Sequence, residues 1–194
     1  MAATMIPATE AGWLAVESVL AQDAAARKCW CRWQKWTNAE YSPATPEDRA
    51  AALRLDVEGG DSPGIVAYLD DAPVGWCAVQ PRTVYRRLPV TKAVAAEAAA
   101  RGDDLADPDV WAIVCFVVAR SARGRGIGHE LLAAAVEVAR VAGARRVVGY
   151  PVDTAAVSTR SAGLNVGTLS MFSRAGFRVV GERGAAKPVV ALDL

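Results

Sequence analysis

The chain has 194 residues, of which 53% are apolar, and its 22 basic side chains nearly balance 21 acidic ones for a formal net charge of +1. This length favours a single domain over residues 1–194 that buries a core without disulfide or metal staples. The small net charge argues against a nucleic-acid partner, because such proteins normally carry a basic excess. The apolar content excludes a mainly disordered chain.

Targeting and membrane signals are weak in this sequence. The longest apolar run, Val110–Ala119, is about half the roughly 20 residues that a membrane-spanning helix needs. The first ten residues show neither the basic start nor the apolar segment of a signal peptide, and four cysteines do not make a disulfide scaffold. We therefore expect a cytoplasmic, reduced protein with no membrane partner.

The first half of the chain predicts helices and a hairpin. An apolar-periodic stretch predicts a helix over 9–26. A second helix is predicted over 45–59, because Thr45 is followed by proline and two acids, which favour a helix N-terminus. Residues 64–69 and 73–79 are predicted strands joined by a tight turn.

Residues 82–108 form a long connection, which we interpret as an insertion between strands. Its alanine-rich middle, 91–101, predicts a helix, and connections of this length are often functional. Arg82, Arg86 and Arg87 could attract an acidic part of a substrate, but we favour a solvated surface for them.

The second half alternates strands and helices, which places parallel strands there, whereas the first half favours antiparallel pairs. The fold class is therefore α/β of the α+β type, with a mixed central sheet flanked by helices. The predicted elements are a buried strand at 110–119, a helix at 129–142, a strand at 146–152, a helix at 165–175, and strands at 177–181 and 188–194.

A glycine-rich loop joins the buried strand to the following helix. Three glycines in five residues let the backbone adopt positive φ angles and approach a ligand closely. Successive amides at the positive end of a helix suit a phosphate or pyrophosphate. The loop, hereafter the glycine loop, consists of Arg123, Gly124, Arg125, Gly126, Ile127 and Gly128.

Three kinds of anion-binding loop compete for this segment. A dinucleotide loop reads G-x-G-x-x-G with an acid at the end of the next strand, and that strand here ends Val148-Gly149-Tyr150 without one. A nucleoside triphosphate loop needs Gly-Lys-Ser/Thr, which the sequence lacks. The pattern R-x-x-G-x-G matches residues 123–128. A plain strand–helix turn is the structural alternative.

The R-x-x-G-x-G match resembles the acyl-CoA-binding motif of the GNAT superfamily of N-acetyltransferases. The stretch Asn165–Phe177 resembles the later motif of that family, an Asn-started helix that closes with Gly-Phe and enters a strand. The resemblance implies a GNAT-like fold that binds acetyl-CoA in a V-shaped slot between two splayed strands. It implies an N-acetyltransferase that takes acetyl-CoA as cosubstrate and acts on a small-molecule or peptide amine.

The same resemblance assigns roles to individual residues. The backbone amide of Val117 is expected to face the thioester oxygen, and the amine is expected to attack the thioester directly. The residues implied in cofactor binding are Val117, Val118, Ala119, Arg123, Gly124, Arg125, Gly126, Ile127, Gly128, Asn165 and Phe172.

The sequence departs from the family pattern at Phe172. Much of the family has a tyrosine there, which is taken to protonate the leaving thiolate, and phenylalanine has no proton to give. The thiolate could leave unprotonated, since thiol pKa values lie near 8.5. Another donor could act, with Ser170, Ser173 and Tyr150 as candidates. The third alternative is a non-catalytic acyl-CoA-binding or regulatory module.

No carboxylate stands out as the base that would deprotonate an amine. Asp109, Asp153 and Glu182 flank predicted strands, but we favour exposed loop or cap roles for them. His129 is the one histidine of the chain, and we expect it on the surface of its helix.

Three tryptophans at a spacing of three residues, Trp30, Trp33 and Trp36, predict one helical stripe. Core packing is one interpretation. The other is an aromatic wall of the acceptor pocket, with Trp30 and Trp33 as substrate-binding residues. The nearby cysteines lack metal-ligand spacing, so we expect no metal. A homodimer is possible on this sequence.

Overall fold

The computed structural model describes residues 3–60, 62–88, 91–102, 104–157 and 161–194. Its centre is a seven-stranded sheet with the order β1-β2-β3-β4-β5-β7-β6. β4 and β5 pair in parallel and the other neighbours pair antiparallel, which confirms the mixed sheet. The strands are β1 (Thr4–Pro7), β2 (Gly64–Leu69), β3 (Ala72–Pro81), β4 (Val110–Val118), β5 (Arg146–Gly149), β6 (Arg178–Glu182) and β7 (Pro188–Asp193).

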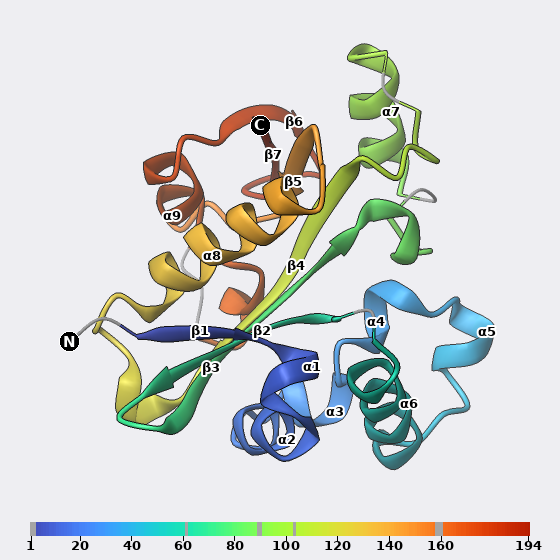
Figure 1. Ribbon diagram of the computed structural model, residues 1–194. Coiled ribbons are helices and arrows are strands. Elements are labelled where there is room, and N and C mark those ends of the chain that lie inside the picture. The colour runs from blue at the N-terminus through green and yellow to red at the C-terminus, as the bar shows by residue number, and fades with distance from the viewer. Residues whose placement is uncertain (1–2, 61, 89–90, 103, 158–160) are drawn as a thin grey trace.

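Helices cover both faces of this sheet (Figure 1). The first six gather on one side of the strands, whereas α8 and α9 lie on the other, and each side has its own buried cluster. Among the described residues, no helix is both long and apolar enough to cross a bilayer. The helices are α1 (Ala8–Ala11), α2 (Trp13–Ala21), α3 (Ala26–Cys29), α4 (Arg32–Lys35), α5 (Asn38–Tyr41), α6 (Pro46–Glu58), α7 (Lys92–Ala100), α8 (Ile127–Val141) and α9 (Leu169–Arg174), with 3₁₀ turns η1 (Arg82–Val84), η2 (Arg120–Ala122) and η3 (Ser161–Val166).

The N-terminal region differs most from its prediction. β1 has no counterpart among the predicted strands, because a four-residue edge strand that ends in proline shows no clear alternation of apolar and polar residues. The helix predicted over 9–26 is interrupted at Gly12, whose φ of 80° separates α1 from α2. The single tryptophan stripe is wrong, because Trp30 and Cys31 adopt left-handed φ angles of 47° and 54° and split the segment into α3 and α4.

The hairpin, the helix starting at Thr45 and the strand–helix order of the second half are confirmed. Thr45 forms a capping box with Asp48, and α6 follows with proline in its first turn. The helix predicted over 165–175 begins only at Leu169, capped by Thr168, because Gly167 with a φ of 78° separates it from η3.

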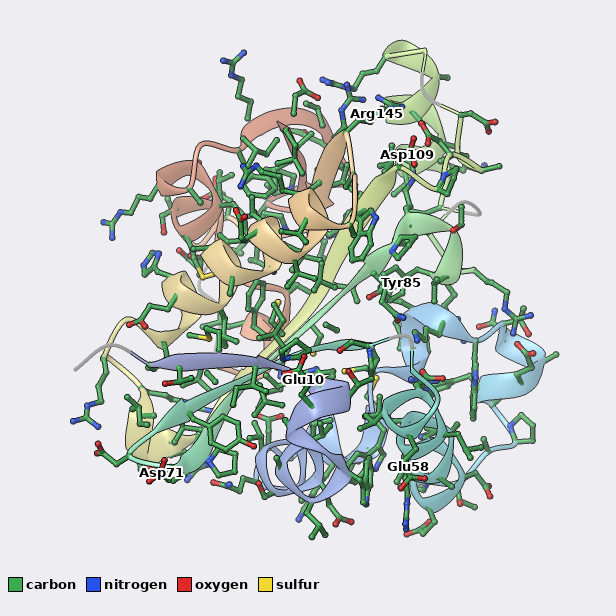
Figure 2. All side chains as sticks on the ribbon, viewed as in Figure 1. Glu10, Glu58, Asp71, Tyr85, Asp109 and Arg145 are labelled. Atoms are coloured by element: carbon green, nitrogen blue, oxygen red, sulfur yellow. The ribbon has the colours of Figure 1, made fainter. Side chains whose placement is uncertain are left out.

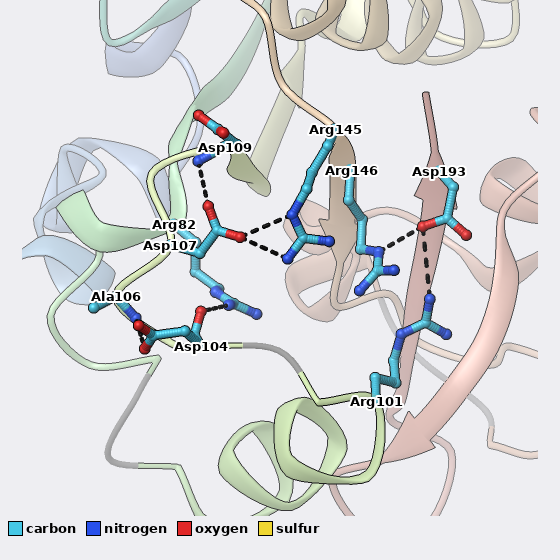
Figure 3. Close-up of polar contacts among 9 residues, drawn as sticks. All are labelled: Arg82, Arg101, Asp104, Ala106, Asp107, Asp109, Arg145, Arg146 and Asp193. Carbon is cyan, nitrogen blue, oxygen red and sulfur yellow. Dashed lines mark hydrogen bonds and ion pairs between the residues drawn. The ribbon is translucent and has the colours of Figure 1, made fainter.

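The connection over 82–108 contains η1 and α7 and is tied to the start of β4 and β5 by polar contacts (Figure 3). Arg82 is fully buried, and its Nη2 donates to the carbonyl of Asp104 at 2.8 Å. Arg145 holds Asp107 through two bonds of 2.8 and 2.6 Å. The solvated surface expected for Arg82 is therefore wrong. The neighbouring arginines also have protein partners, since Arg86 pairs with Glu40.

Candidate functional site

Two parallel strands open into a wedge at the centre of the sheet. β4 and β5 pair from Val110 with Arg146 to Ile113 with Gly149, where β5 ends while β4 continues to Val118. The pairing of β4 with β3 skips Val114, which marks a bulge at the same level. The bulge and the end of β5 leave one edge of β4 without a neighbouring strand, so the splayed strands predicted around the slot are present.

The glycine loop lies at the mouth of this wedge and begins α8. Gly124 and Gly126 have φ angles of 76° and 85°, and a methyl group added to either would meet no atom within 4 Å. Among the described residues, none of the five amides from 124 to 128 donates a hydrogen bond to a protein acceptor. A run of free amides at the start of a long helix is the arrangement expected for an anion site.

The arginines of the glycine loop behave differently from each other. Arg123 donates from Nε to the carbonyl of Val118 at 3.0 Å, and its Nη2 lies 3.8 Å from the carboxylate of Asp23. Arg125 is exposed. The first arginine therefore ties the loop to the end of β4, whereas the second leaves its charge open to solvent.

A cavity of about 280 Å³, hereafter the slot cavity, runs along the free edge of β4. A second hollow of about 440 Å³ continues from it over the glycine loop. Together they contain most of the residues predicted to bind the cofactor. The slot cavity is lined by Asp23, Phe116, Val117, Val118, Arg123, Gly128, Leu164, Asn165, Gly167, Thr168 and Met171, and the hollow adds Ala122, Gly124, Gly126, Ile127 and His129.

The register of β4 decides which amide faces the slot. Ala119 donates its amide to Val74 of β3 at 2.8 Å, and Val117 pairs with Trp76 in the same ladder. Alternate residues of a strand point their backbone groups to opposite edges. The amide of Val117 therefore faces β3, and the amide of Phe116 faces the open edge. This corrects the expectation that Val117 donates to the thioester oxygen.

Phe172 is a packing residue and lines neither cavity. Its side chain is fully buried, with ring centroids 6.0 Å from Phe116 and 5.0 Å from Phe177 in edge-on contacts. A methyl group at Gly149 would lie 2.4 Å from its ring, so the ring fills the floor beneath the end of β5. The assignment of Phe172 to cofactor binding is therefore corrected to support of the slot from below.

Two of the three candidate proton donors, Ser170 and Tyr150, have different surroundings, and neither lines a cavity in the described part of the chain. Ser170 is exposed, and its hydroxyl lies 3.1 Å from that of Thr168. Tyr150 is buried, and Arg183 stacks over its ring at 4.9 Å. Neither is among the described residues that line the slot cavity or its neighbours. Of the three carboxylates that flank predicted strands, Asp109 lies just before the start of β4. It is at the end of the sheet opposite to Asp71 (Figure 2).

A third cavity of about 210 Å³, hereafter the cysteine cavity, adjoins the slot cavity and shares Asn165 with it. Trp33 lines it and is 48% exposed. Trp30 instead packs in the core against Trp13, with centroids 5.7 Å apart, so its substrate-binding role is wrong. The lining is Ala25, Ala26, Cys29, Cys31, Trp33, Gln34, Val114, Cys115, Asn165 and Val166.

A buried ion-pair cluster supports the wall of the cysteine cavity. The carboxylate of Asp56 on α6 lies 2.5 Å from Arg32 and 2.7 Å from Lys35, both in α4. Burial alone would raise the pKa of Asp56, but the guanidinium of Arg32 and the ammonium of Lys35 outweigh it and lower that pKa. Burial lowers the pKa of Lys35 despite its contact with the carboxylate. The cluster fixes α4, and with it the loop that carries Cys31.

Sequence reasoning missed several lining residues. Asp23 reaches the slot cavity from the segment between α2 and α3, whereas Leu164, Thr168 and Met171 reach it from η3 and the start of α9. Thr168 alone had a usable signal, because a threonine after Gly167 and before an apolar run is a helix cap. The cysteines showed no motif, since their meeting in one cavity depends on the tertiary fold.

The comparisons with known proteins agree with this geometry. The model of the acetyltransferase (GNAT) family matches residues 30–162. The chain belongs to the GNAT family of acetyltransferases. No curated protein sequence matches the chain.

Solved structures share the fold at low sequence identity. The GCN5-related N-acetyltransferase from Kribbella flavida is 20% identical with a TM-score of 0.58, over 100% of this chain and 98% of that one. A mosquito arylalkylamine N-acetyltransferase like 5b is 12% identical with a TM-score of 0.63, over 100% of both chains. A phosphinothricin acetyltransferase from Sinorhizobium meliloti, solved with AcCoA, is 18% identical with a TM-score of 0.56, over 100% of this chain and 89% of that one.

Proposed function

We propose that this GNAT protein transfers the acetyl group of acetyl-CoA to an amine by direct attack of the nitrogen on the thioester. One observation carries the proposal: the run of free amides from 124 to 128 lies at the mouth of a wedge whose free strand edge leads to the cysteine cavity. An anion site, an edge for an extended arm and a pocket for an acceptor follow one another in that order.

Different residues along the wedge would bind different parts of acetyl-CoA. The amides of Gly124, Gly126 and Gly128 would hold the pyrophosphate, because free amides at the start of α8 favour negative charge. Val118 would pair with the pantetheine arm, since its backbone groups face the open edge as those of Phe116 do.

The amide of Phe116 would stabilise the oxygen of the tetrahedral intermediate. Removal of one such donor typically costs about 10²–10³-fold in rate. Asn165 lies where the slot cavity meets the cysteine cavity, and an amine held there would reach the thioester. Positioning of the two reactants supplies much of the remaining acceleration.

A mass-spectrometric acetylation screen over amines and peptides tests this function. Amines with apolar or aromatic bodies should react best, because the cysteine cavity has no charged side chain among its described lining residues. The screen should show an acetylated product and release of free CoA thiol in equal amounts.

The alternative is an acyl-CoA-binding module without catalysis. It was suggested by Phe172, and the burial of that side chain beneath the slot removes it from the proton-transfer path in either case. Binding of acetyl-CoA without thiol release, across a broad amine panel, would favour the module and contradict the enzyme.

A further inference from the structure

The cysteine cavity contains titratable groups that the proposed function does not yet use. Its described lining has three thiols, Cys29, Cys31 and Cys115, two side-chain amides, and no carboxylate or imidazole. An alkylamine is protonated at neutral pH, with a pKa near 10, and must lose a proton before it attacks. A thiol is the kind of group in this lining that titrates closest to neutrality.

Cys31 is held in an unusual backbone geometry. It follows Trp30, and both residues adopt left-handed φ angles, a conformation that costs about 1–2 kcal/mol for each non-glycine residue. Strain of this kind persists where the surrounding structure enforces it and is concentrated at functional sites. Here the left-handed backbone places the sulfur of Cys31 3.2 Å from the indole Nε1 of Trp76, which donates a hydrogen bond to that sulfur.

The neighbours of Cys31 favour its ionised form. The thiol of Cys115 on β4 donates to the Cys31 sulfur and lowers the pKa of Cys31, and the Trp76 indole acts in the same direction. The positive charges of Arg32 and Lys35 add to this effect, whereas burial opposes it. The net direction is downward, so Cys31 is the electron-rich thiol of the cavity.

The other titratable groups around Cys31 stay neutral or are already paired. Burial raises the pKa values of Cys29 and Cys77, and the charge of Cys31 adds to the effect at both thiols. For Cys115, the hydrogen bond to Cys31 and burial together raise the pKa of the thiol. Burial likewise raises the pKa of Tyr85, which lies where β3 enters the long connection (Figure 2).

The carboxylate of Asp56 is an anion of the same cluster, and Arg32 and Lys35 both contact it. One carboxylate against two cations leaves a net positive charge beside the sulfur. A negative charge in this cluster therefore resides most favourably on Cys31.

The position of Cys31 suits proton transfer at the thioester. Val114 and Cys115 of β4 line the cysteine cavity, and the next residue, Phe116, lines the slot cavity. Successive residues of one strand therefore lead from the thiols to the amide that faces the thioester oxygen.

We propose that the thiolate of Cys31 is the catalytic base that deprotonates the ammonium group of the acceptor. This inference rests on the proposed acetyl transfer. One N–H bond of the ammonium breaks and an S–H bond forms on Cys31. The nitrogen lone pair then forms the new C–N bond, and the C–S bond to CoA breaks. The surplus proton on the nitrogen moves to the CoA thiolate, and Cys31 releases its proton to water.

The first test compares wild type with Cys31→Ala, using the alkylamine that gives the highest turnover in the screen. At neutral pH we expect kcat/KM to fall about 10²–10⁴-fold, the usual contribution of general base catalysis. The loss should shrink as pH approaches the pKa of the free amine, because solvent then supplies the neutral nucleophile. Stabilisation by CoA should be unchanged.

A second variant separates proton transfer from packing. Cys115→Ala removes the donor to Cys31, so the acid limb of the kcat/KM profile should move to higher pH while the plateau remains within about tenfold, less than the loss of the base itself. Cys77→Ala is the matched control, because it removes a buried thiol from the other face of the sheet. The acid limb of the kcat/KM profile of Cys77→Ala should lie at the same pH as that of wild type.

Ultraviolet titration of thiolate absorbance checks the base without any acceptor. Wild type should show an ionisation below the ordinary thiol range of about 8.5, and Cys31→Ser should lack it. Absence of that ionisation in wild type would overturn the proposal, as would a Cys31→Ala enzyme with the pH profile of wild type. Failure of wild type to acetylate any amine would instead overturn the proposed function, and the base with it.

Discussion

The glycine loop and the cysteine cavity lie at opposite ends of one cleft and are built by opposite means. The loop is contiguous in sequence and works through backbone amides that glycine leaves accessible. The cavity is assembled from α3, α4, β4 and η3, and its chemistry lies in side chains. Substitutions in the loop should therefore weaken binding of the cosubstrate. Substitutions around the cavity should lower the stability of the fold or the rate of reaction with the acceptor.

The largest expected effect is on stability, at the ion-pair cluster behind the cysteine cavity. Asp56→Ala leaves Arg32, which is 3% exposed, without its carboxylate. Breaking a buried ion pair typically costs about 3–5 kcal/mol, and we expect the lower end because Asp56 is partly exposed. Urea unfolding measures this loss in the free energy of unfolding. The CoA affinity of the folded variant should be unchanged. A loss equal to that of Glu58→Ala, which removes a surface pair on the same helix, would contradict this account.

The same carboxylate predicts a pH dependence. Because the fold lowers the pKa of Asp56, its contribution to stability is complete above the unfolded pKa of about 3.9. The contribution disappears as pH falls through the folded pKa. The difference in unfolding free energy between wild type and Asp56→Asn should therefore shrink below about pH 4 and stay constant above it.

The next effect concerns the floor of the slot. Phe172→Tyr places a hydroxyl among Phe116, Phe177 and Gly149, where a buried group without a partner costs about 1–3 kcal/mol. Turnover of the folded variant should stay within about tenfold, below the usual contribution of a general acid. Thermal unfolding and thiol release measure the two quantities. A gain of a hundredfold in turnover would show instead that this position reaches the leaving thiolate.

A change in the glycine loop should act on binding alone. Gly126→Val puts a branched side chain into the open space beside the free amides at a φ of 85°, and CoA affinity should fall at least tenfold, or about 1.4 kcal/mol. Gly143→Val is the matched control, because Gly143 has a φ of 84° and equally open surroundings at the other end of α8. Both should lose similar stability, and calorimetric titration should show weak CoA binding in the first only.

The smallest expected effect is at Trp33. Arg87 lies 3.9 Å over its ring and Tyr41 meets it edge-on, but the side chain is half exposed. Trp33→Ala should cost about 0.5–1 kcal/mol of stability, as for an exposed cation–π pair. It should raise KM for aromatic amines more than kcat changes, and Trp33→Phe should restore KM. An unchanged KM would remove Trp33 from the acceptor pocket.

The parts of the molecule that follow local rules were predictable. The capping box at Thr45, the hairpin and the glycine loop each depend on a few consecutive residues, and all three are in place. The order of strands and helices in the second half also followed from periodicity.

The parts that depend on register or tertiary contacts were not predictable. Whether Val117 or Phe116 faces the slot depends on pairing with β3, in which a shift by one residue reverses every amide. The left-handed backbone at Trp30 and Cys31 opposes the helical periodicity of that segment, and the gathering of the cysteines follows from it. Burial of Phe172 could not be told from a ligand contact, since both favour an aromatic side chain.

Thermal unfolding with added CoA tests the central claim that the glycine loop and its wedge bind acyl-CoA. At about one hundred times the dissociation constant, CoA should stabilise wild type by roughly 2.7 kcal/mol, or about 5–10 °C for a chain of this size. NAD and ATP should shift it much less, and Gly126→Val should lose most of the shift that Gly143→Val retains. An equal shift with NAD, or a full CoA shift in Gly126→Val, would contradict the account.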